Sequence, residues 1–161
     1  MELDRMGQCV RSAWEYAVEE HGKATVSRPG VTTAHLLLGV LKEESCAGGL
    51  ILAKLGLDIQ LARGITEFLL LHSRRRAGAE EGTAEWGGVT HTIAARKVLD
   101  LALEEANLYS ATYPIGTEHL LLGLLRVPES LGFRILRYFG LEEARVRAAR
   151  GELWELLRSP E

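Results

Sequence analysis

The sequence contains two copies of one pattern, spaced 84 residues apart. Residues 33–41 and 117–125 both hold a threonine, a histidine two residues later, three successive leucines and a glycine. Upstream, residues 14–20 match residues 99–105 at an offset of 85. Further matches follow the leucines: Gly48 with Gly132, Leu52 with Leu136, Gly56 with Gly140, and Leu57 with Leu141. Two leucine-rich helices would not keep glycines and a histidine in place by chance, so the sequence predicts a tandem duplication.

Each copy predicts four helices, because its apolar residues recur at three- and four-residue spacing. The second helix of each copy begins near Thr33 or Thr117, whose hydroxyl can cap the first turn. The third and fourth helices are expected at residues 47–55 and 59–72 in the first copy, and at 131–139 and 142–157 in the second. No two-residue alternation is sustained, as a half-buried strand would require. The predicted fold class is therefore all-α, with eight helices in two pseudo-equivalent four-helix repeats.

The three successive leucines indicate that the second helix of each copy is almost completely buried. Three adjacent positions cover about 300° of a helix, which is far more than one amphipathic face. Gly39 and Gly123 fall inside these helices, where a glycine costs about 1 kcal/mol relative to alanine. Close packing against another helix would offset that cost. Gly56 and Gly140 follow the third helices, where a left-handed residue commonly ends a helix.

The domain organisation predicted is one domain over residues 1–161. Repeat one spans about residues 3–72, a linker about 73–90, and repeat two about 91–158. The linker is rich in Gly, Ala, Glu and Arg and has no apolar period. Arg74, Arg75 and Arg76 form the one dense basic run, and a nucleic-acid role would need a broader basic face.

Composition restricts the function classes. The formal net charge is −3, from 22 acidic and 19 basic residues, which argues against a dedicated nucleic-acid binder. No apolar run approaches the ~20 residues that cross a bilayer, and the mixed, acidic first residues do not read as a signal peptide. Two cysteines, Cys9 and Cys46, cannot form a disulfide framework. We therefore expect a cytoplasmic protein with reduced thiols and no membrane association.

Residues 116–125, with Leu136, Gly140 and Leu141 following, resemble the Clp repeat. This is the double four-helix module at the N-terminus of Clp-family AAA+ ATPases, and the chain is most similar to the ClpC type over roughly residues 5–157. In that family the module is not catalytic. The resemblance implies a protein-binding module that recognises substrates and adaptor proteins and delivers them to an ATPase ring, which unfolds them for a partner protease.

The ATPase signature of that family is absent from this sequence. No Gly-x-x-x-x-Gly-Lys-Ser/Thr phosphate loop occurs, since Gly22-Lys23 precedes Ala24 and lacks the upstream glycine. The expected function is therefore that of a stand-alone Clp N-domain, with protein or peptide clients, adaptors or Clp subunits as partners, and with no cofactor. No paired carboxylates, metal cluster or triad points to an enzyme. The alternative is a helical effector-binding or transcription-regulatory domain, for which the last helix, with Arg145, Arg147 and Arg150, would be the basic element.

The ClpC resemblance also implies binding of phosphorylated arginine, with one site in each repeat. There the glutamate of the motif pairs with the guanidinium, and a threonine at the start of the first helix holds the phosphate. In the second copy these positions are Glu118 and Thr92, and in the first copy they are Ala34 and Gly7. We therefore expect repeat two alone to bind phospho-arginine. The alternative for Glu118 is a first-turn acid that faces solvent and is favoured by the helix dipole.

Three further residue types need an interpretation. His35 and His119 have no second ligand at helical spacing, so no metal site is predicted, and the resemblance implies hydrogen bonds between helices. Cys9 and Cys46 are expected to be buried apolar cysteines. Trp86 lies in the glycine-flanked linker and either marks a partner-binding site or folds back onto the groove between the repeats.

Overall fold

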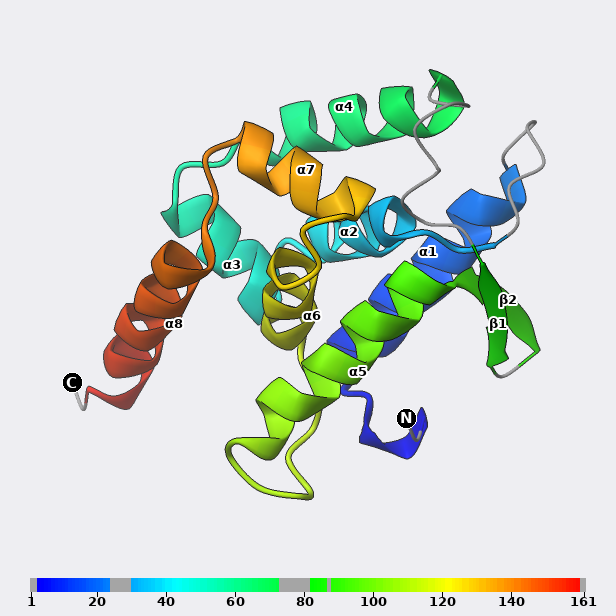
Figure 1. The fold of residues 1–161 in the computed structure, drawn as a ribbon. Coiled ribbons are helices and arrows are strands. Elements are labelled where there is room, and N and C mark those ends of the chain that lie inside the picture. The colour runs from blue at the N-terminus through cyan, green and yellow to red at the C-terminus, as the bar shows by residue number, and fades with distance from the viewer. Residues whose placement is uncertain (1–2, 24–29, 73–81, 87, 160–161) are drawn as a thin grey trace.

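The computed structural model describes residues 3–23, 30–72, 82–86 and 88–159, and within these ranges it confirms the predicted all-α class (Figure 1). A short 3-10 helix, Leu3–Arg5, precedes the first α-helix. The α-helices are α1 (Gln8–Lys23), α2 (Thr33–Lys42), α3 (Ala47–Lys54), α4 (Ile59–His72), α5 (Ile93–Asn107), α6 (Thr117–Leu125), α7 (Leu131–Tyr138) and α8 (Glu143–Arg158). None of these helices is both long and apolar enough to cross a membrane.

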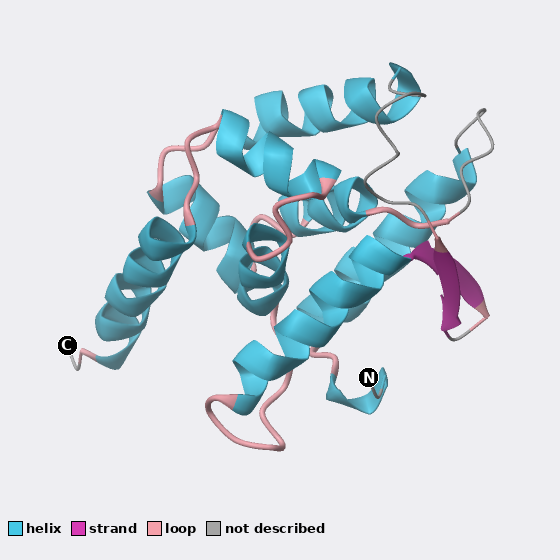
Figure 2. Cartoon of the chain, viewed as in Figure 1, coloured by secondary structure: helices cyan, strands magenta, loops and turns pink. Residues whose placement is uncertain are grey.

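A two-stranded hairpin, which the sequence did not predict, occupies part of the region expected to be a linker (Figure 2). Strands β1 (Thr83–Trp86) and β2 (Val89–Thr92) pair antiparallel, with Thr83 opposite Thr92. Threonine, valine and tryptophan favour strands, and Gly88 at φ 76° supports the tight turn. Four residues per strand are too few for alternation to be recognised in the sequence. Residues 74–76, the basic run, lie outside the described residues.

Helices α2 and α6 form the centre of the molecule (Figure 1). Every residue from Thr33 to Leu41 and from Thr117 to Leu125 is buried, which confirms the prediction made from the leucines. The prediction for the two glycines is also confirmed. A Cβ on Gly39 would collide with the carbonyl oxygen of Ala13 in α1, and one on Gly123 would lie 2.6 Å from the carbonyl oxygen of Val98 in α5.

The two repeats are joined by a reciprocal pair of hydrogen bonds. The hydroxyl of Thr33 accepts from the amide of Gly132 at 2.9 Å, and that of Thr117 accepts from the amide of Gly48 at 2.9 Å. The prediction that Thr33 and Thr117 cap their own helices was therefore wrong, because the N-cap residues are Thr32 and Gly116. Each threonine instead binds the third helix of the other repeat. Figure 1 shows the resulting arrangement, with α7 against α2 and α3 against α6.

The two repeat histidines bond within their own helix starts, whereas the hydrogen bonds between helices that the resemblance implies stay a prediction. His35 Nδ1 accepts from the amide of Thr32 at 3.0 Å, and His119 Nδ1 accepts from the amide of Gly116 at 2.9 Å. A side chain at the third helical position that bonds back to the N-cap amide is one half of a capping box. The shared histidine thus caps the first turn of its own helix.

The two cysteines are bonded, so the expectation of reduced, buried thiols was wrong. Cys9 and Cys46 form a disulfide with a Cα–Cα distance of 6.2 Å, and both residues are only partly buried. Cys9 lies in the first turn of α1 and Cys46 is the N-cap of α3. Their separation of 37 residues gave no hint of this pairing, because only the packing of α3 beside the start of α1 brings them together.

Candidate binding sites at the junctions between the repeats

The two repeats meet through matching pairs of short backbone segments. A bridge joins Met6, two residues before α1, to Ile115, two residues before α6. The equivalent bridge joins Val31, before α2, to His91, before α5. Each repeat therefore brings the start of its first helix to the start of the second helix of the other repeat. A site that uses both helix starts is composed of residues from both copies.

The first of these junctions contains a cavity of about 230 Å³. It lies between the start of α1, the start of α3 at Ala47, and the segment from Tyr113 to Glu118. The start of a helix offers unpaired amides and the positive end of the dipole, which suits an anion. Gly7 and Gln8 line this side of the cavity. Gly7 occupies the position that the resemblance assigns to a phosphate-holding threonine, so no hydroxyl is contributed there.

Glu118 lines the same cavity and does not face solvent, contrary to the alternative considered from the sequence. The residue is only 5% exposed, and its carboxylate folds back beside Gly116. Burial raises the pKa of Glu118, although its own backbone amide and the charge of Arg150 act in the opposite direction. His119 Nε2 lies 3.7 Å from Glu118 Oε1. Burial, with a further effect of Arg150, lowers the pKa of His119 to about 4, so this imidazole is neutral at neutral pH.

Thr92 lies at the second junction and not beside Glu118. It is 1% exposed and caps α5, since its hydroxyl accepts from the amide of Ala95 at 3.1 Å. Its own amide donates to the carbonyl of Val31, three residues before Ala34. Thr92 thus lies at the junction with repeat one, in which alanine replaces the glutamate of the motif.

The predicted pair of Thr92 and Glu118 is therefore not brought together in one site. Thr92 precedes the first residue of α5, whereas His119, next to Glu118, contacts Tyr109 just beyond its last turn. A helix of 15 residues is about 22 Å long. Each junction keeps one of the two groups named by the resemblance: a glutamate without the threonine at the first, and a threonine without the glutamate at the second.

Trp86 packs against the body of the protein at the end of β1. Its ring lies edge-on to that of Trp14 in α1, with centroids 5.2 Å apart, and the residue is partly buried. Trp14 also contacts His91 of β2 at 6.4 Å. Trp86 thus anchors the hairpin to α1 and keeps part of its surface accessible, so a role in partner binding stays a prediction.

A buried carboxylate that the sequence analysis did not single out joins α5 to α8. Glu105 is 2% exposed and accepts from Arg147 at 2.7 and 2.9 Å and from Arg126 at 3.1 Å. The hydrogen bond from Arg147, together with the charges of the surrounding arginines, holds the pKa of Glu105 below its ordinary value despite the burial. An acid on the apolar face of a periodic helix was the available signal in the sequence. Such an acid is buried only when it is paired.

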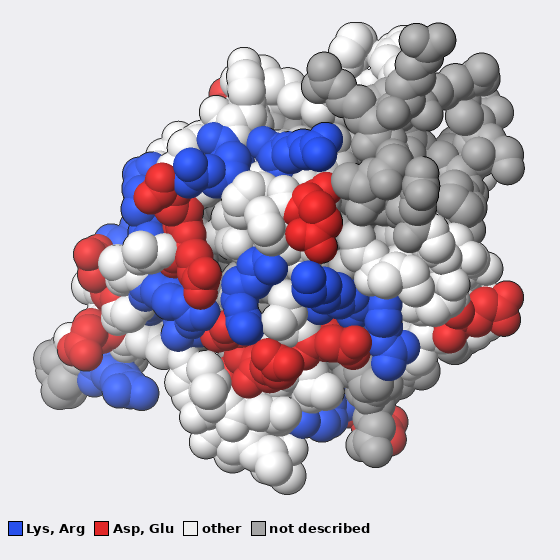
Figure 3. Space-filling view, viewed as in Figure 1, with Lys and Arg blue, Asp and Glu red and all other residues white. Residues whose placement is uncertain are grey.

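Arginines of the proposed basic recognition helix also bond within the protein. Arg147 is bound to Glu105 and Glu143, and Arg145 donates to the carbonyl of Gly140. On the face shown in Figure 3, basic and acidic side chains alternate and do not gather into one broad basic patch. Within the described ranges, no three His, Cys, Asp or Glu side chains gather as metal ligands would.

Comparison with known proteins gives relatives from one family. The ATP-dependent Clp protease ATP-binding subunit ClpC of Staphylococcus epidermidis is 29% identical over 161 residues, which cover 100% of this chain and 18% of that protein. The chloroplastic chaperone protein ClpC2 of Oryza sativa is 32% identical over 117 residues, which cover 73% of this chain and 12% of that protein. The chain thus spans less than a fifth of the length of these relatives.

The fold is that of a solved N-terminal domain. The crystal structure of the N-terminal domain of ClpD from Arabidopsis thaliana matches with a TM-score of 0.69 and 22% identity, covering 96% of this chain and 97% of that one. This likeness shows the arrangement of helices. The model of the Clp repeat (R) N-terminal domain matches residues 4–139, and the chain belongs to this family.

Proposed function

We propose that this chain is a non-catalytic protein-binding module that engages substrates, adaptors or subunits of a Clp machine. The observation that carries the proposal is the family match over residues 4–139. The structure supports it with a well-packed double-repeat core and a cavity at the first junction between the repeats. Acting on Clp clients, such a module would serve as an adaptor or regulator of chaperone-dependent proteolysis.

Affinity capture with the full chain tests this proposal. The tagged chain, immobilised and incubated with a purified ClpC-type ATPase, a ClpP-type protease and a labelled model client in separate arms, should retain at least one of them. Trp86→Ser should weaken capture if the hairpin takes part, with Glu85→Gln on the same strand as the matched control. Capture of none of the three would reject the proposal.

For phospho-arginine, the cavity beside Glu118 is the supporting observation. A carboxylate and the amides at the start of α1 line one space, as a zwitterionic ligand would require. Gly7 supplies no hydroxyl and Thr92 lies at the other end of α5, so we expect weaker binding than in a site that holds both groups. Titration calorimetry of phospho-arginine should show a loss of affinity in Glu118→Gln and no change in Thr92→Asn, which keeps the helix cap. If Glu118→Gln binds phospho-arginine as tightly as the parent chain and Thr92→Asn do, Glu118 does not form this site.

The compartment is also a proposal, and the cysteines test it. A cytoplasmic chain would hold Cys9 and Cys46 as thiols at equilibrium, whereas a stable disulfide is typical of oxidising compartments. Alkylation of the protein in freshly lysed source cells, followed by mass spectrometry, distinguishes the two. Labelling of both cysteines would support a cytoplasmic location, and labelling of neither would support an oxidising compartment.

A further inference from the structure

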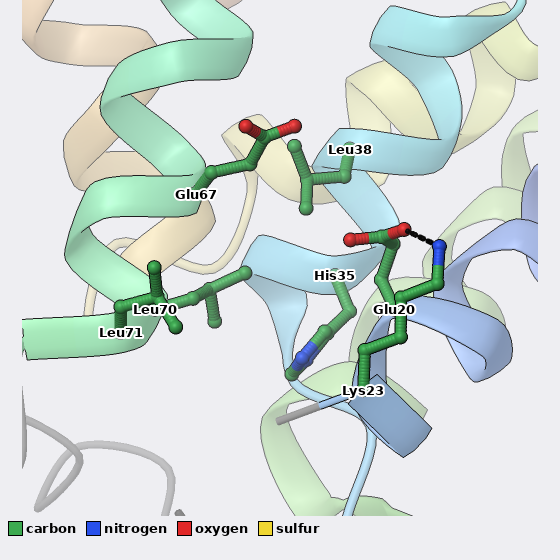
Figure 4. Close-up of a pocket in the computed structure, with 7 residues that line it drawn as sticks. All are labelled: Glu20, Lys23, His35, Leu38, Glu67, Leu70 and Leu71. Atoms are coloured by element: carbon green, nitrogen blue, oxygen red, sulfur yellow. Dashed lines mark hydrogen bonds and ion pairs between the residues drawn. The ribbon is translucent and has the colours of Figure 1, made fainter. Parts of the chain in front are cut away.

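A second cavity, away from both junctions, lies between α1, α2 and α4 (Figure 4). Its volume is about 180 Å³, smaller than the roughly 300–1,000 Å³ of drug-sized sites, so it suits the end of one side chain. Leu38, Leu70 and Leu71 form apolar walls. Glu20 and Lys23 from α1 and Glu67 from α4 also line the cavity, as Figure 4 shows.

The charges around this cavity are not balanced. Glu20 shares Lys23 with Glu19, at 2.8 and 2.9 Å, and the lysine side chain is 58% exposed. Glu67 is partly buried and has no hydrogen bond or ion pair with any residue that the structure describes. The cavity therefore combines apolar walls and Lys23 with one carboxylate, that of Glu67, which forms no ion pair with a described residue.

Repeat two carries an arginine near the acid that corresponds to Glu20. The pattern offsets match Glu20 with Glu105, His35 with His119, and Thr66 with Arg150. The charge of Arg150 acts on both Glu105 and His119. Its guanidinium lies 5.7 Å from the ring centroid of Tyr109, and its Nη1 is buried without a hydrogen-bond partner in the structure. An arginine of the chain itself thus lies beside the acid and the histidine of that repeat.

Repeat one holds a threonine where repeat two holds Arg150. Thr66 is fully buried, and its hydroxyl donates to the carbonyl of Ala62 at 2.7 Å, so it reaches neither Glu20 nor His35. Arg63, the equivalent of Arg147, donates instead to the hydroxyl of Tyr16 at 3.3 Å. Arg147 and Arg150 are two of the three arginines that act on Glu105, and among the described residues neither of their counterparts forms an ion pair with Glu20.

We propose that the cavity between α1, α2 and α4 binds the guanidinium end of an arginine side chain presented by a protein partner. That the arginine belongs to a protein partner rests on the proposed function, whereas the binding of a guanidinium in this cavity does not. A guanidinium suits the site better than an ammonium, because it is planar, weakly hydrated and able to bond two carboxylates through a rigid fork of donors. Its methylene groups would lie along Leu70 and Leu71.

The test uses N-acetyl-arginine amide as the probe and the uncharged, isosteric N-acetyl-citrulline amide as its control. In a titration followed by ¹⁵N–¹H NMR on the full chain, the arginine probe should shift the amides of residues 20–23, 35 and 67–71. The citrulline probe should shift them at least about tenfold less at equal concentration, since it lacks the charge. Equal shifts with both probes, or shifts centred on residues 116–119, would overturn the proposal.

Glu67→Gln is the decisive variant, because no hydrogen bond or ion pair of Glu67 to a described residue is lost. It should weaken binding of the arginine probe about tenfold, while Glu15→Gln on the solvent face of α1 should leave binding unchanged. Unchanged affinity in Glu67→Gln contradicts the proposal. A chain that binds the probe yet captures no Clp component would keep the pocket and reject the proposed function.

Discussion

The imidazole of His119 is buried with only 1% of its side chain exposed, and it must stay neutral to accept the amide of Gly116. The pKa of His119 falls from 6.5 to about 4 in the folded protein. A lowered histidine pKa contributes stability that is complete above pH 6.5 and is lost as pH falls toward 4. The unfolding free energy should therefore drop by about 3 kcal/mol across this range, at about 1.4 kcal/mol per pH unit.

Urea denaturation at half-unit pH steps measures this loss. His119→Gln is the control, because glutamine at this helical position can still accept from the N-cap amide but does not titrate. The variant should show a shallower slope between pH 6.5 and 5. An unchanged slope would mean that His119 does not carry the pH dependence.

The ionisation of Glu118 should change stability with pH in the opposite direction. Its folded pKa is raised, so the protonated form is favoured in the folded state, and stability is lost as pH rises from 4.5 through the folded pKa. Glu118→Gln removes this loss and should be more stable than the parent chain at pH 8, with the difference narrowing toward pH 4. Thermal unfolding at the two pH values measures it, and a variant less stable at pH 8 would contradict the burial argument.

At the scale of elements, the contact between α1 and α2 depends on the absence of a side chain at Gly39. Alanine there would gain about 1 kcal/mol in helix propensity but would collide with the carbonyl of Ala13, and overpacking of this kind costs about 1–3 kcal/mol. Because the colliding atom is backbone and cannot rotate away, the steric term should win. We expect Gly39→Ala to destabilise the chain by about 1 kcal/mol in urea denaturation.

Gly64 is the matched control in α4. A Cβ there meets nothing within 4 Å, so alanine brings only the propensity gain and should stabilise by up to about 1 kcal/mol. The two variants make the same chemical change in two helices of one chain, and they should move stability in opposite directions. If both variants change stability in the same direction, the close approach of α1 and α2 does not determine the effect of a side chain at residue 39.

At the scale of the whole molecule, the disulfide between Cys9 and Cys46 links the start of α1 to the start of α3. Closing a loop of 37 residues is worth about 4 kcal/mol when the loss of unfolded-chain entropy is counted. Reduction with dithiothreitol should therefore lower the melting temperature by roughly 10 °C. The double variant Cys9→Ser, Cys46→Ser should melt like the reduced chain and be insensitive to the reductant. An equal melting temperature of the parent chain with and without dithiothreitol would contradict this prediction.

Much of the architecture could be predicted from local patterns. The fourth helix of repeat one, Ile59–His72, has the predicted bounds, and the third helices end within one residue of the expected positions. Gly56 and Gly140 have φ of 80° and 74°, as expected after a helix end. These features depend on residues within a few turns of one another, which is why periodicity and end signals were sufficient.

The candidate sites were predicted less well, because their partners are far apart in the chain. Thr92 and Glu118 belong to one repeat by sequence, but the crossed packing places each beside the other repeat, next to Val31 and Gly7 respectively. Thr33 and Thr117 were misassigned for the same reason, since their partners lie 99 and 69 residues away. A repeat can be recognised from its spacing, whereas the pairing between its copies cannot.

The sequence by itself determined the duplication, the helical class, the burial of the leucine helices and the need for glycine within them, because each follows from the spacing of residues along one helix. The tertiary structure alone decided the exchange of contacts between the repeats, the disulfide, the pairing of Glu105 and the cavity between α1, α2 and α4. These depend on which helix faces meet, and that choice is made by the shape of the whole core and not by any local propensity.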